Sequence, residues 1–420
     1  MISSTGIDSL NTAHNVFTAT VLDNGNSYLY NISLHWFTAV FGNSITTYTL
    51  FSKLCTIALL LVFYMLCRMV MGDTLYVALA VALLAMDNMM GMSHEIRAYS
   101  MGAMCITAAA LFFYKFLFVK DKPATLLAAG LWSVASVLCH FLSVYVVLTL
   151  LPALLIVKGK RLFTIRNIIA MLIPVVLIGI FFGFAAHGLS IMSRQNAKIQ
   201  QATHTFSVME ALLRSMRYTA INFKFVFPAL NPSMVIAFVS FLAVPVIYVM
   251  GLFNAATNVQ RRNLHLFFWL GVSGSLFLFL LCLKSHHYTA LYYRYLSFCV
   301  PFCCLCTAYV AQVLAARQRA GRAVAGGLVV VVLLPAVVFF SLYLVRTHAV
   351  VKYNHTEIAM EIARSGATRI AVPDWEDALL INSLLPTGYK IDYARDQLSP
   401  NFTLYTASGI KQIPVVKNNS

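Results

Sequence analysis

Long runs of apolar residues without a charged side chain recur throughout this chain of 420 residues. A helix needs about 20 such residues to cross the roughly 30 Å hydrocarbon core of a bilayer. Only 10% of the residues are charged, whereas soluble domains carry about a quarter. The runs predict a polytopic α-helical membrane protein, because a membrane β-barrel shows short alternating segments and a disordered chain has low hydrophobicity.

Ten apolar segments are considered as spans, and basic residues concentrate in every second connection between them. The positive-inside rule places these basic connections in the cytoplasm. A net charge of +16 that is held in short loops is not the basic face of a nucleic-acid-binding domain, so no nucleic-acid partner is expected. The segments are 48–67, 74–92, 98–118, 124–139, 141–157, 167–187, 233–252, 264–283, 295–315 and 323–345.

This topology divides the chain into three parts. Residues 1–47 are expected to form an external loop with interfacial helices, 48–345 a transmembrane domain, and 346–420 a small external α/β domain. The transmembrane domain contains a long external loop at 188–232. In the last part, the pattern of apolar residues predicts strands at 369–373, 389–393 and 402–405 and helices at 356–364 and 375–385.

Two features of the external parts leave alternatives open. Asp374, Glu376 and Asp377 follow a proline, where they either begin a helix or bind a cation. The segment 207–216 has helical spacing and is expected on the membrane surface, either as a gate over the site or as a plain interfacial helix.

The N-terminal part has neither a Lys or Arg before the first span nor the pattern of a signal peptide. If both ends lie outside, a further span upstream of Met1 is the simplest way to translocate this part. The nine cysteines lie in spans or at their ends, so no disulfide framework is expected. Cys303, Cys304 and Cys306 are interpreted as small residues that pack between helices rather than as metal ligands.

The segment 87–101, at the outer end of the second span and the start of the third, holds more polar residues than a membrane protein retains without use. Arg97 offers a guanidinium suited to phosphate, and Glu95 could orient it or accept a proton. The alternative is an ion pair that anchors a helix end. The candidates in this segment are Asp87, His94, Glu95, Arg97 and Tyr99.

A second polar cluster precedes the ninth span. Its cations, histidines and tyrosines could hold an anionic head group at the outer surface. The alternative is an aromatic belt with cations that reach the interface. The candidates here are Lys284, His286, His287, Arg294 and Tyr295. Neither a zinc-protease motif nor a nucleophile elbow is present, which disfavours hydrolysis by either route.

Three segments carry a resemblance to a known family. They are 28–44, which closes the first external loop, 93–101 at the next external turn, and 293–301 at the entry to a late span. In this order they resemble the GT-C membrane glycosyltransferases, in particular the bacterial branch related to protein O-mannosyltransferases and the lipid A aminoarabinose transferase.

The resemblance implies transfer of a sugar from a polyprenyl-phosphate donor to a lipid, glycan or protein acceptor at the outer face of the cytoplasmic membrane. It implies inversion at the anomeric carbon and an acidic residue of the first external loop as catalytic base. Asp8 and an acid upstream of Met1 are the candidates for this base, and Glu95 is a further catalytic candidate. It also implies that Arg97 and the loop 284–294 hold the donor phosphate, and His35 in the first segment joins the binding candidates. No cofactor is expected, with a divalent cation left open.

Two other classes of function compete with this interpretation. A lipid or sugar transporter would show paired repeats and broken helices near the midplane, which the positions of the prolines do not indicate. A non-catalytic subunit of an envelope-glycan assembly is the third class, because the family's acidic pair has no clear match here. Transfer of sugar, as opposed to movement of donor without transfer, separates the three classes.

Overall fold

The computed structural model describes most of the chain between residues 28 and 317 and four strands near the C-terminus. The described residues are 28–42, 45–87, 98–201, 206–223, 234–285, 293–317, 361, 362, 364, 369–372, 390–393, 401–406 and 409–414. Within these, the side chains of 45, 46, 184–201, 234–240, 293, 294, 317 and the strands are outside the description.

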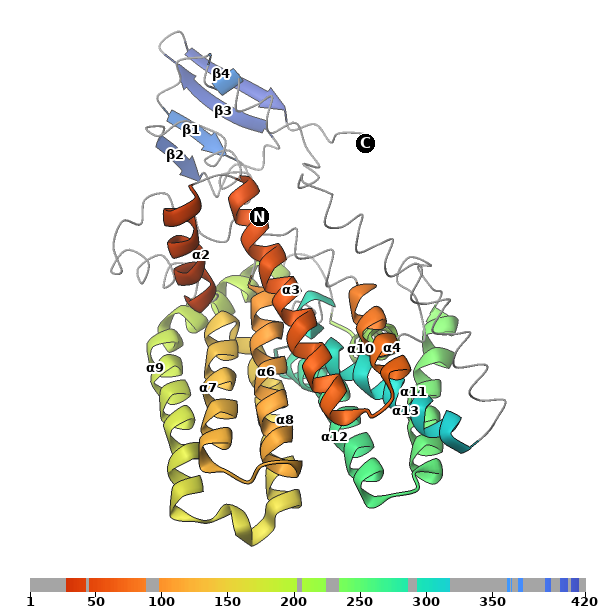
Figure 1. Ribbon diagram of the computed structural model, residues 1–420. Helices are drawn as coiled ribbons and strands as arrows, with labels where there is room; N and C mark the ends of the chain where they lie inside the picture. The colour runs from red at the N-terminus through yellow and green to blue at the C-terminus, as the bar shows by residue number, and fades with distance from the viewer. Residues whose placement is uncertain are drawn as a thin grey trace.

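The described part is dominated by helices that pack into one bundle (Figure 1). Helix α6 lies among the others, with its faces packed against α3 and α7, and α13 packs against α4, α11 and α12. The helices are α2 (Tyr28–Phe41), α3 (Ile45–Val70), α4 (Thr74–Ala85), α6 (Tyr99–Phe118), α7 (Pro123–Cys139), α8 (Val144–Lys158), α9 (Ile165–Gln201), α10 (Val208–Asn222), α11 (Met234–Asn254), α12 (Asn258–Ser285) and α13 (Val300–Arg317), with short 3₁₀ turns η1 (Phe141–Ser143), η2 (Gly159–Leu162) and η5 (Tyr293–Leu296).

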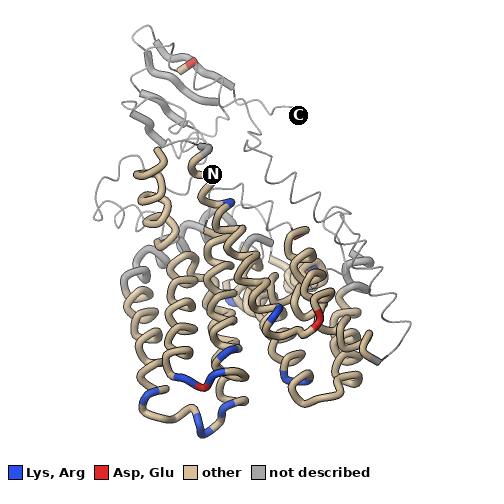
Figure 2. Tube along the Cα trace, viewed as in Figure 1, with Lys and Arg blue, Asp and Glu red and all other residues tan. Residues whose placement is uncertain are grey.

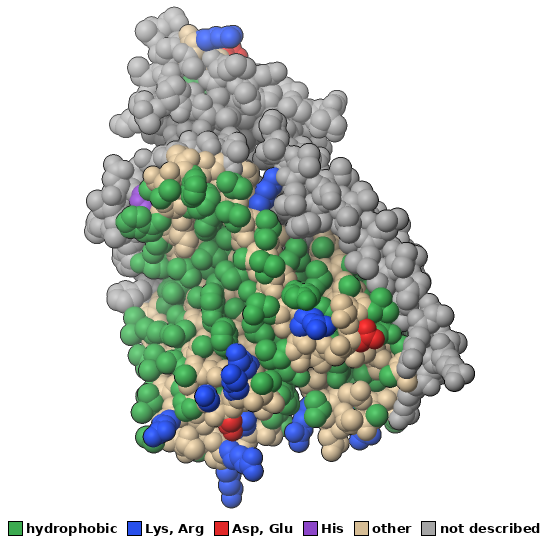
Figure 3. All heavy atoms as spheres, viewed as in Figure 1, with side chains coloured by type: hydrophobic (Ala, Val, Ile, Leu, Met, Phe, Trp, Pro, Cys, Tyr) green, Lys and Arg blue, Asp and Glu red, His purple; other side chains and the backbone are tan. Residues whose placement is uncertain are grey.

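Five of these helices are long and apolar enough to cross a membrane. The stretches are Thr47–Val70, Tyr99–Phe118, Phe141–Leu162 (α8 with the 3₁₀ turns η1 and η2 at its ends), Ile165–Gly183 and Asn258–Ser285. Large apolar side chains cover the sides of the bundle, as Figure 3 shows for one face. Apolar surface of this extent suits lipid and not water. The chain is a multi-pass membrane protein.

Nine of the ten predicted spans coincide with described helices, and the tenth, at 323–345, lies outside the described residues. Four of the nine helices contain apolar stretches shorter than a full span, namely Thr74–Ala85, Pro123–Cys139, Phe241–Asn254 and Val300–Ala316. The total of ten spans therefore stays a prediction.

The connections that join α6 to α7, α8 to α9 and α11 to α12 lie at the same end of the bundle, at the bottom of Figure 1. Lys and Arg gather at this end (Figure 2). The alternation of basic and non-basic connections in the sequence thus matches two opposite ends of one bundle. We call them the basic end and the opposite end.

Close approach between helices depends on small residues. A Cβ atom on Gly102 of α6 would lie 2.7 Å from Cε1 of Phe298, and Gly130 of α7 touches Pro174 of α9. On α12, a Cβ atom at Gly271 would lie 2.9 Å from the thiol of Cys303 on α13, and one at Gly274 would lie 2.9 Å from the thiol of Cys299, which directly precedes α13. These two thiols therefore fill the space that glycine leaves on α12, and all nine cysteines are free and buried.

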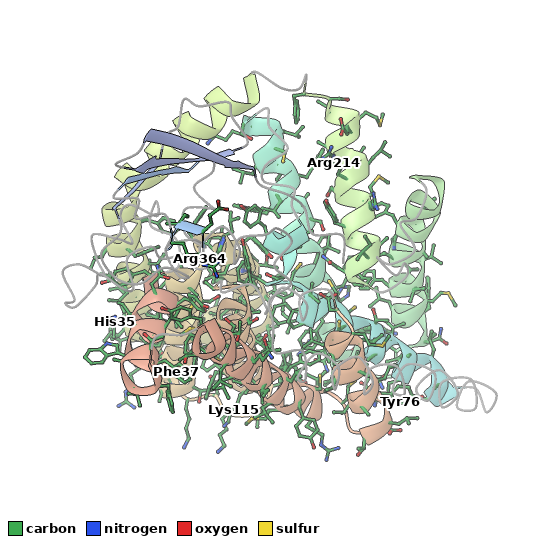
Figure 4. All side chains as sticks on the ribbon, turned by 90° about the horizontal axis from the view of Figure 1, so that it is seen from above. His35, Phe37, Tyr76, Lys115, Arg214 and Arg364 are labelled. Carbon is green, nitrogen blue, oxygen red and sulfur yellow. The ribbon has the colours of Figure 1, made fainter. Side chains whose placement is uncertain are left out.

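The helix predicted at 207–216 is present as α10. Ser207 begins it, since its Oγ accepts a hydrogen bond from the backbone N–H of Glu210. Figure 4, which looks along the bundle from above, shows α10 (labelled at Arg214) along its length, so it crosses the direction of its neighbours. Its inner face is anchored on the bundle because Ser215 Oγ donates to the carbonyl of Ser275 at 3.1 Å.

Four strands near the C-terminus form one sheet in the order β2-β1-β3-β4. Strand β1 (Arg369–Val372) pairs in parallel with β2 (Lys390–Tyr393) and antiparallel with β3 (Asn401–Thr406), which pairs with β4 (Gly409–Pro414). The first three fall on the predicted strands, whereas β4 was not predicted. The predicted helix at 375–385 and its acidic residues lie outside the described residues.

Candidate functional site

A histidine interrupts the helical path between α7 and α8. Cys139 ends α7, His140 is extended with φ −159° and ψ 117°, and η1 follows before α8 begins at Val144. The Nδ1 atom of His140 accepts a hydrogen bond from the backbone N–H of Leu142 at 3.3 Å, so the side chain caps the turn. Only 5% of His140 is exposed. The sequence prediction missed this residue, whose one signal is a polar side chain between two apolar runs.

Three aromatic rings from two segments, the start of α6 and the stretch from η5 to α13, surround His140. The centroid of its ring lies 5.3 Å from Phe298, 5.4 Å from Tyr99 and 5.6 Å from Tyr295. The hydroxyl of Tyr145 donates to the backbone carbonyl of Tyr295 at 3.1 Å, which fixes η5 to the start of α8. We call His140, Tyr99, Tyr295 and Phe298 the His140 cluster. It brings together Tyr99 and Tyr295, which the sequence predicted as binding candidates.

Helix α2 extends the same region. Tyr30 and Leu34 are buried in one apolar cluster with Ala98 and Cys139, the residues just before Tyr99 and His140. The Tyr30 hydroxyl and Ser52 Oγ are hydrogen-bonded at 2.9 Å. Burial raises the pKa of the Tyr30 hydroxyl well above its usual range, and the hydrogen bond with Ser52 lowers it by less. Tyr30 is therefore a neutral, buried partner of the N-terminal half of α3.

His35, also on α2, is placed differently. It follows the buried Leu34 by one residue, about 100° round the helix, and its ring packs against Trp36 with centroids 6.0 Å apart. Trp36 is 68% exposed, and Figure 4 shows His35 at the edge of the molecule. Within the described residues, no ring contact or hydrogen bond joins His35 to the His140 cluster.

A buried polar stripe lines the N-terminal half of α3. Thr49, Ser52, Lys53 and Thr56 lie within about 100° of one another round the helix and are all buried. Thr56 Oγ1 donates to Ser100 Oγ at 3.1 Å, which joins the stripe to the first turn of α6. Lys53 is 8% exposed and lies six residues inside the apolar stretch Thr47–Val70. At about 1.5 Å per residue this places its Cα about 9 Å below the start of the stretch.

Asp87 and Lys284 mark two further helix ends in this region. Asp87 follows α4, is buried, and its backbone N–H donates to the carbonyl of Leu84 at 3.0 Å. Lys284 is exposed in the last turn of α12, where a cation is favourable beside the free carbonyl groups. Because α6 and α12 both have their other ends at the basic end, Tyr99 and Lys284 belong to the opposite end.

The remaining predicted site residues are not placed by the structure. Asp8, His94, Glu95, Arg97, His286 and His287 lie outside the described residues, and of Arg294 only the backbone is described, within η5. Among the described residues, no three His, Cys, Asp or Glu side chains gather in a way that could hold a metal ion.

Buried polar atoms lie directly beneath the His140 cluster. Asn222, at the end of α10, is fully buried, and its Nδ2 approaches the thiol of Cys299 at 3.8 Å while its Oδ1 has no hydrogen-bond partner. A Cβ atom on Gly274 would touch both this thiol and the ring of Tyr145. The Oγ atoms of Ser143 and Ser275 also lack partners. The end of α10 therefore places polar groups against α12 and α13, a feature that helical spacing alone does not reveal.

Comparisons with known proteins identify no relative of this chain. No family model matches the chain, and neither a curated protein nor a solved structure matches it.

The aromatic rings and the cations of this region suit different chemical roles. Aromatic rings round a histidine at a helix break give this end of the bundle a largely apolar wall. The exposed cation of Lys284 and the cation of Lys53, a residue that is largely buried in the N-terminal half of α3, suit an anionic head group. All of these groups lie at helix ends or in the halves of helices nearer the opposite end of the bundle, and not at its centre.

Proposed function

We propose that the chain is a membrane glycosyltransferase that moves a sugar from a polyprenyl-phosphate donor to a lipid, glycan or protein acceptor. One observation carries the proposal. The three segments that resemble the GT-C family lie far apart in the sequence, and residues of each meet at the end of α7: Tyr30 beside Cys139, and Tyr99, Tyr295 and Phe298 round His140. A shared site is the simplest reason for their convergence.

The proposed reaction is a direct displacement. An external carboxylate, for which Asp8 and Glu95 are the candidates, takes the proton of an acceptor hydroxyl or amine. The acceptor atom attacks the anomeric carbon as the bond from that carbon to the phosphate oxygen breaks, and polyprenyl phosphate leaves with the electron pair. Because the leaving group is already a stable anion, positioning and charge stabilisation contribute more than acid catalysis. The configuration at the anomeric carbon inverts.

The cations and rings have separate roles in this proposal. Arg97, Lys284 and Arg294 hold the donor phosphate near the outer surface, with His286 and His287 beside them. Tyr295, the partly exposed member of the His140 cluster, is the ring against which the sugar rests, and the buried Tyr99, His140 and Phe298 hold it in position. Asp87 and His94 are further binding candidates. His35 is the weakest of the binding candidates because it lies on a different face of α2 from Tyr30. A divalent cation bound by external carboxylates remains open.

The proposal extends to topology. We place the protein in the cytoplasmic membrane with ten spans, the basic end in the cytoplasm and the C-terminal α/β domain outside. The clustering of Lys and Arg at one end of the bundle supports this orientation (Figure 2).

A buried cation gives the transporter alternative its one specific support. Lys53 lies within the apolar stretch of α3 and is buried, as expected for a residue on a substrate path. Its place in the outer third of that stretch fits a site open to the outer face better than a midplane transport site. A transporter would move the intact donor across the bilayer, whereas a transferase releases polyprenyl phosphate.

Substitution of Arg97 tests the proposed phosphate role. Arg97→Ala should abolish transfer of a labelled sugar from a polyprenyl-phosphate donor in proteoliposomes, while Arg261→Ala at the basic end leaves transfer intact. Thermal unfolding of both variants verifies that they fold. Transfer by a folded Arg97→Ala variant at the wild-type rate removes Arg97 from the site.

A further inference from the structure

Two neighbouring connections at the basic end carry an unusual concentration of one charge. Residues 115–122, from the end of α6 to the start of α7, and 158–166, from the end of α8 to the start of α9, contain seven basic residues and one acid. At the third turn of this end, between α11 and α12, the basic residues are two, Arg261 and Arg262, in the first turn of α12. To orient the protein in the membrane, the loops on one side need only carry more Lys and Arg than those on the other. The concentration of basic residues on two of these loops therefore suggests a second role for them.

The single acid of these loops is already paired. Asp121 Oδ2 lies 3.0 Å from Lys158 Nζ, so the pair joins the two connections to each other. The ammonium group of Lys158 also lies 4.9 Å from the centre of the Phe116 ring. The other cations of the loops are therefore not neutralised by an acid of either loop. Lys120, Lys122, Lys160, Arg161 and Arg166 are exposed.

The second loop holds its cations in a fixed turn. Gly159 adopts φ 50°, which lets the chain turn sharply after α8. Leu162 is buried, and Asn167 Nδ2 donates to the backbone carbonyl of Arg161 at 3.3 Å. Lys160 and Arg161 therefore project from a turn that is anchored on both sides, which lowers the entropic cost of binding a ligand.

Large apolar side chains stand next to these cations. Val119, Ile156, Phe163 and Ile165 are between 56% and 82% exposed. Figure 3 shows blue and green side chains adjoining at this end. A soluble acidic protein would leave these apolar groups in water, whereas a phospholipid covers them with acyl chains and meets the cations with its phosphate. The combination favours a lipid.

We infer that the α6–α7 and α8–α9 connections form a binding site for anionic phospholipid head groups, with Lys160 and Arg161 as its principal phosphate ligands. This inference does not depend on the proposed transferase activity. The apolar residues Ile156, Phe163 and Ile165 contact the acyl chains of the same lipid. The site selects lipids with a net negative charge over zwitterionic lipids, because the unpaired cations attract a net negative charge.

The test uses the purified full-length chain in a neutral detergent. Phosphatidylglycerol or phosphatidylcholine is titrated in, and native mass spectrometry measures bound lipid. The variant Lys160→Gln/Arg161→Gln should bind phosphatidylglycerol on the order of thirtyfold more weakly than the wild type. The control Arg261→Gln/Arg262→Gln removes the same charge from the same end and should keep affinity within a few-fold of the wild type. Asp121→Asn should bind phosphatidylglycerol more tightly, because it removes the only acid.

Three results overturn the inference. They are equal affinity of the wild type for phosphatidylglycerol and phosphatidylcholine, wild-type affinity in the Lys160→Gln/Arg161→Gln variant, and equal losses in this variant and the Arg261→Gln/Arg262→Gln control. Because all of these side chains are exposed, the variants are expected to fold, and thermal unfolding without lipid verifies this.

Discussion

Substitutions of His140 can separate the two contributions that this side chain makes to the fold. The Nδ1 atom caps the turn after α7 through the Leu142 N–H, while the ring packs against Tyr99, Tyr295 and Phe298. His140→Phe keeps a ring and removes the acceptor. His140→Asn keeps an acceptor of a type that is good at caps and removes the ring.

The expected costs follow from these contacts. Loss of the acceptor leaves a buried N–H without a partner, which costs about 1–3 kcal/mol. Each aromatic neighbour contributes about 0.5–1.5 kcal/mol beyond burial. His140→Ala loses both and should lower the free energy of unfolding by on the order of 4 kcal/mol, more than either His140→Phe or His140→Asn.

Cysteine accessibility offers a direct assay. All nine cysteines are free and buried, so a thiol-reactive fluorescent dye reports unfolding of the bundle on heating. The midpoint should fall in the order wild type, then the Phe and Asn variants, then Ala. A loss below about 1 kcal/mol for His140→Ala would refute the reasoning, since it would mean that neither the cap nor the ring packing stabilises this end.

Two further substitutions test the packing of α6 and α12. Gly102→Ala should lower the free energy of unfolding by about 1–3 kcal/mol, because its Cβ would lie 2.7 Å from Phe298. The control is Gly179→Ala on α9, where a Cβ would have nothing within 4 Å, and it should be neutral or stabilising in the same dye assay. Asn263→Ala should cost about 1–3 kcal/mol, because Asn263 Nδ2 donates to two tyrosine hydroxyls, each at 3.2 Å; an unchanged unfolding midpoint would show that these bonds do not stabilise the bundle.

The sequence predicted those features of the fold that depend only on residues close together in the chain. Nine apolar segments became helices because the length and composition of each are local properties, and the alternation of basic loops placed their ends correctly at one end of the bundle. Strands β1, β2 and β3 were predicted for the same reason. The short α4 shows the limit, since apolar composition predicted 74–92 and the helix ends at Ala85.

The site depends on contacts that a local pattern does not contain. Tyr99 and Tyr295 were predicted separately from polar clusters at helix ends, but their meeting requires η5 to be held by Tyr145 and α7 to stop at Cys139. His140 is a single histidine between two apolar runs, and this local pattern does not predict that its ring packs against Tyr99 and Tyr295. The burial of Asn222 likewise depends on α10 crossing α12 and α13, which helical spacing does not determine.

The central claim, transfer at the end of the bundle opposite the basic loops, is tested most directly by following one donor in sealed proteoliposomes. The donor is a polyprenyl-phosphate-linked sugar that carries one label on the sugar and a second label on the lipid. Donor and acceptor, the latter an envelope fraction, are both added outside the proteoliposomes. A transferase releases one polyprenyl phosphate for each sugar transferred, and the sugar in the product has inverted anomeric configuration. Movement of the intact donor to the inner leaflet, with sugar and lipid labels still joined and no product formed, would contradict the claim and identify a transporter.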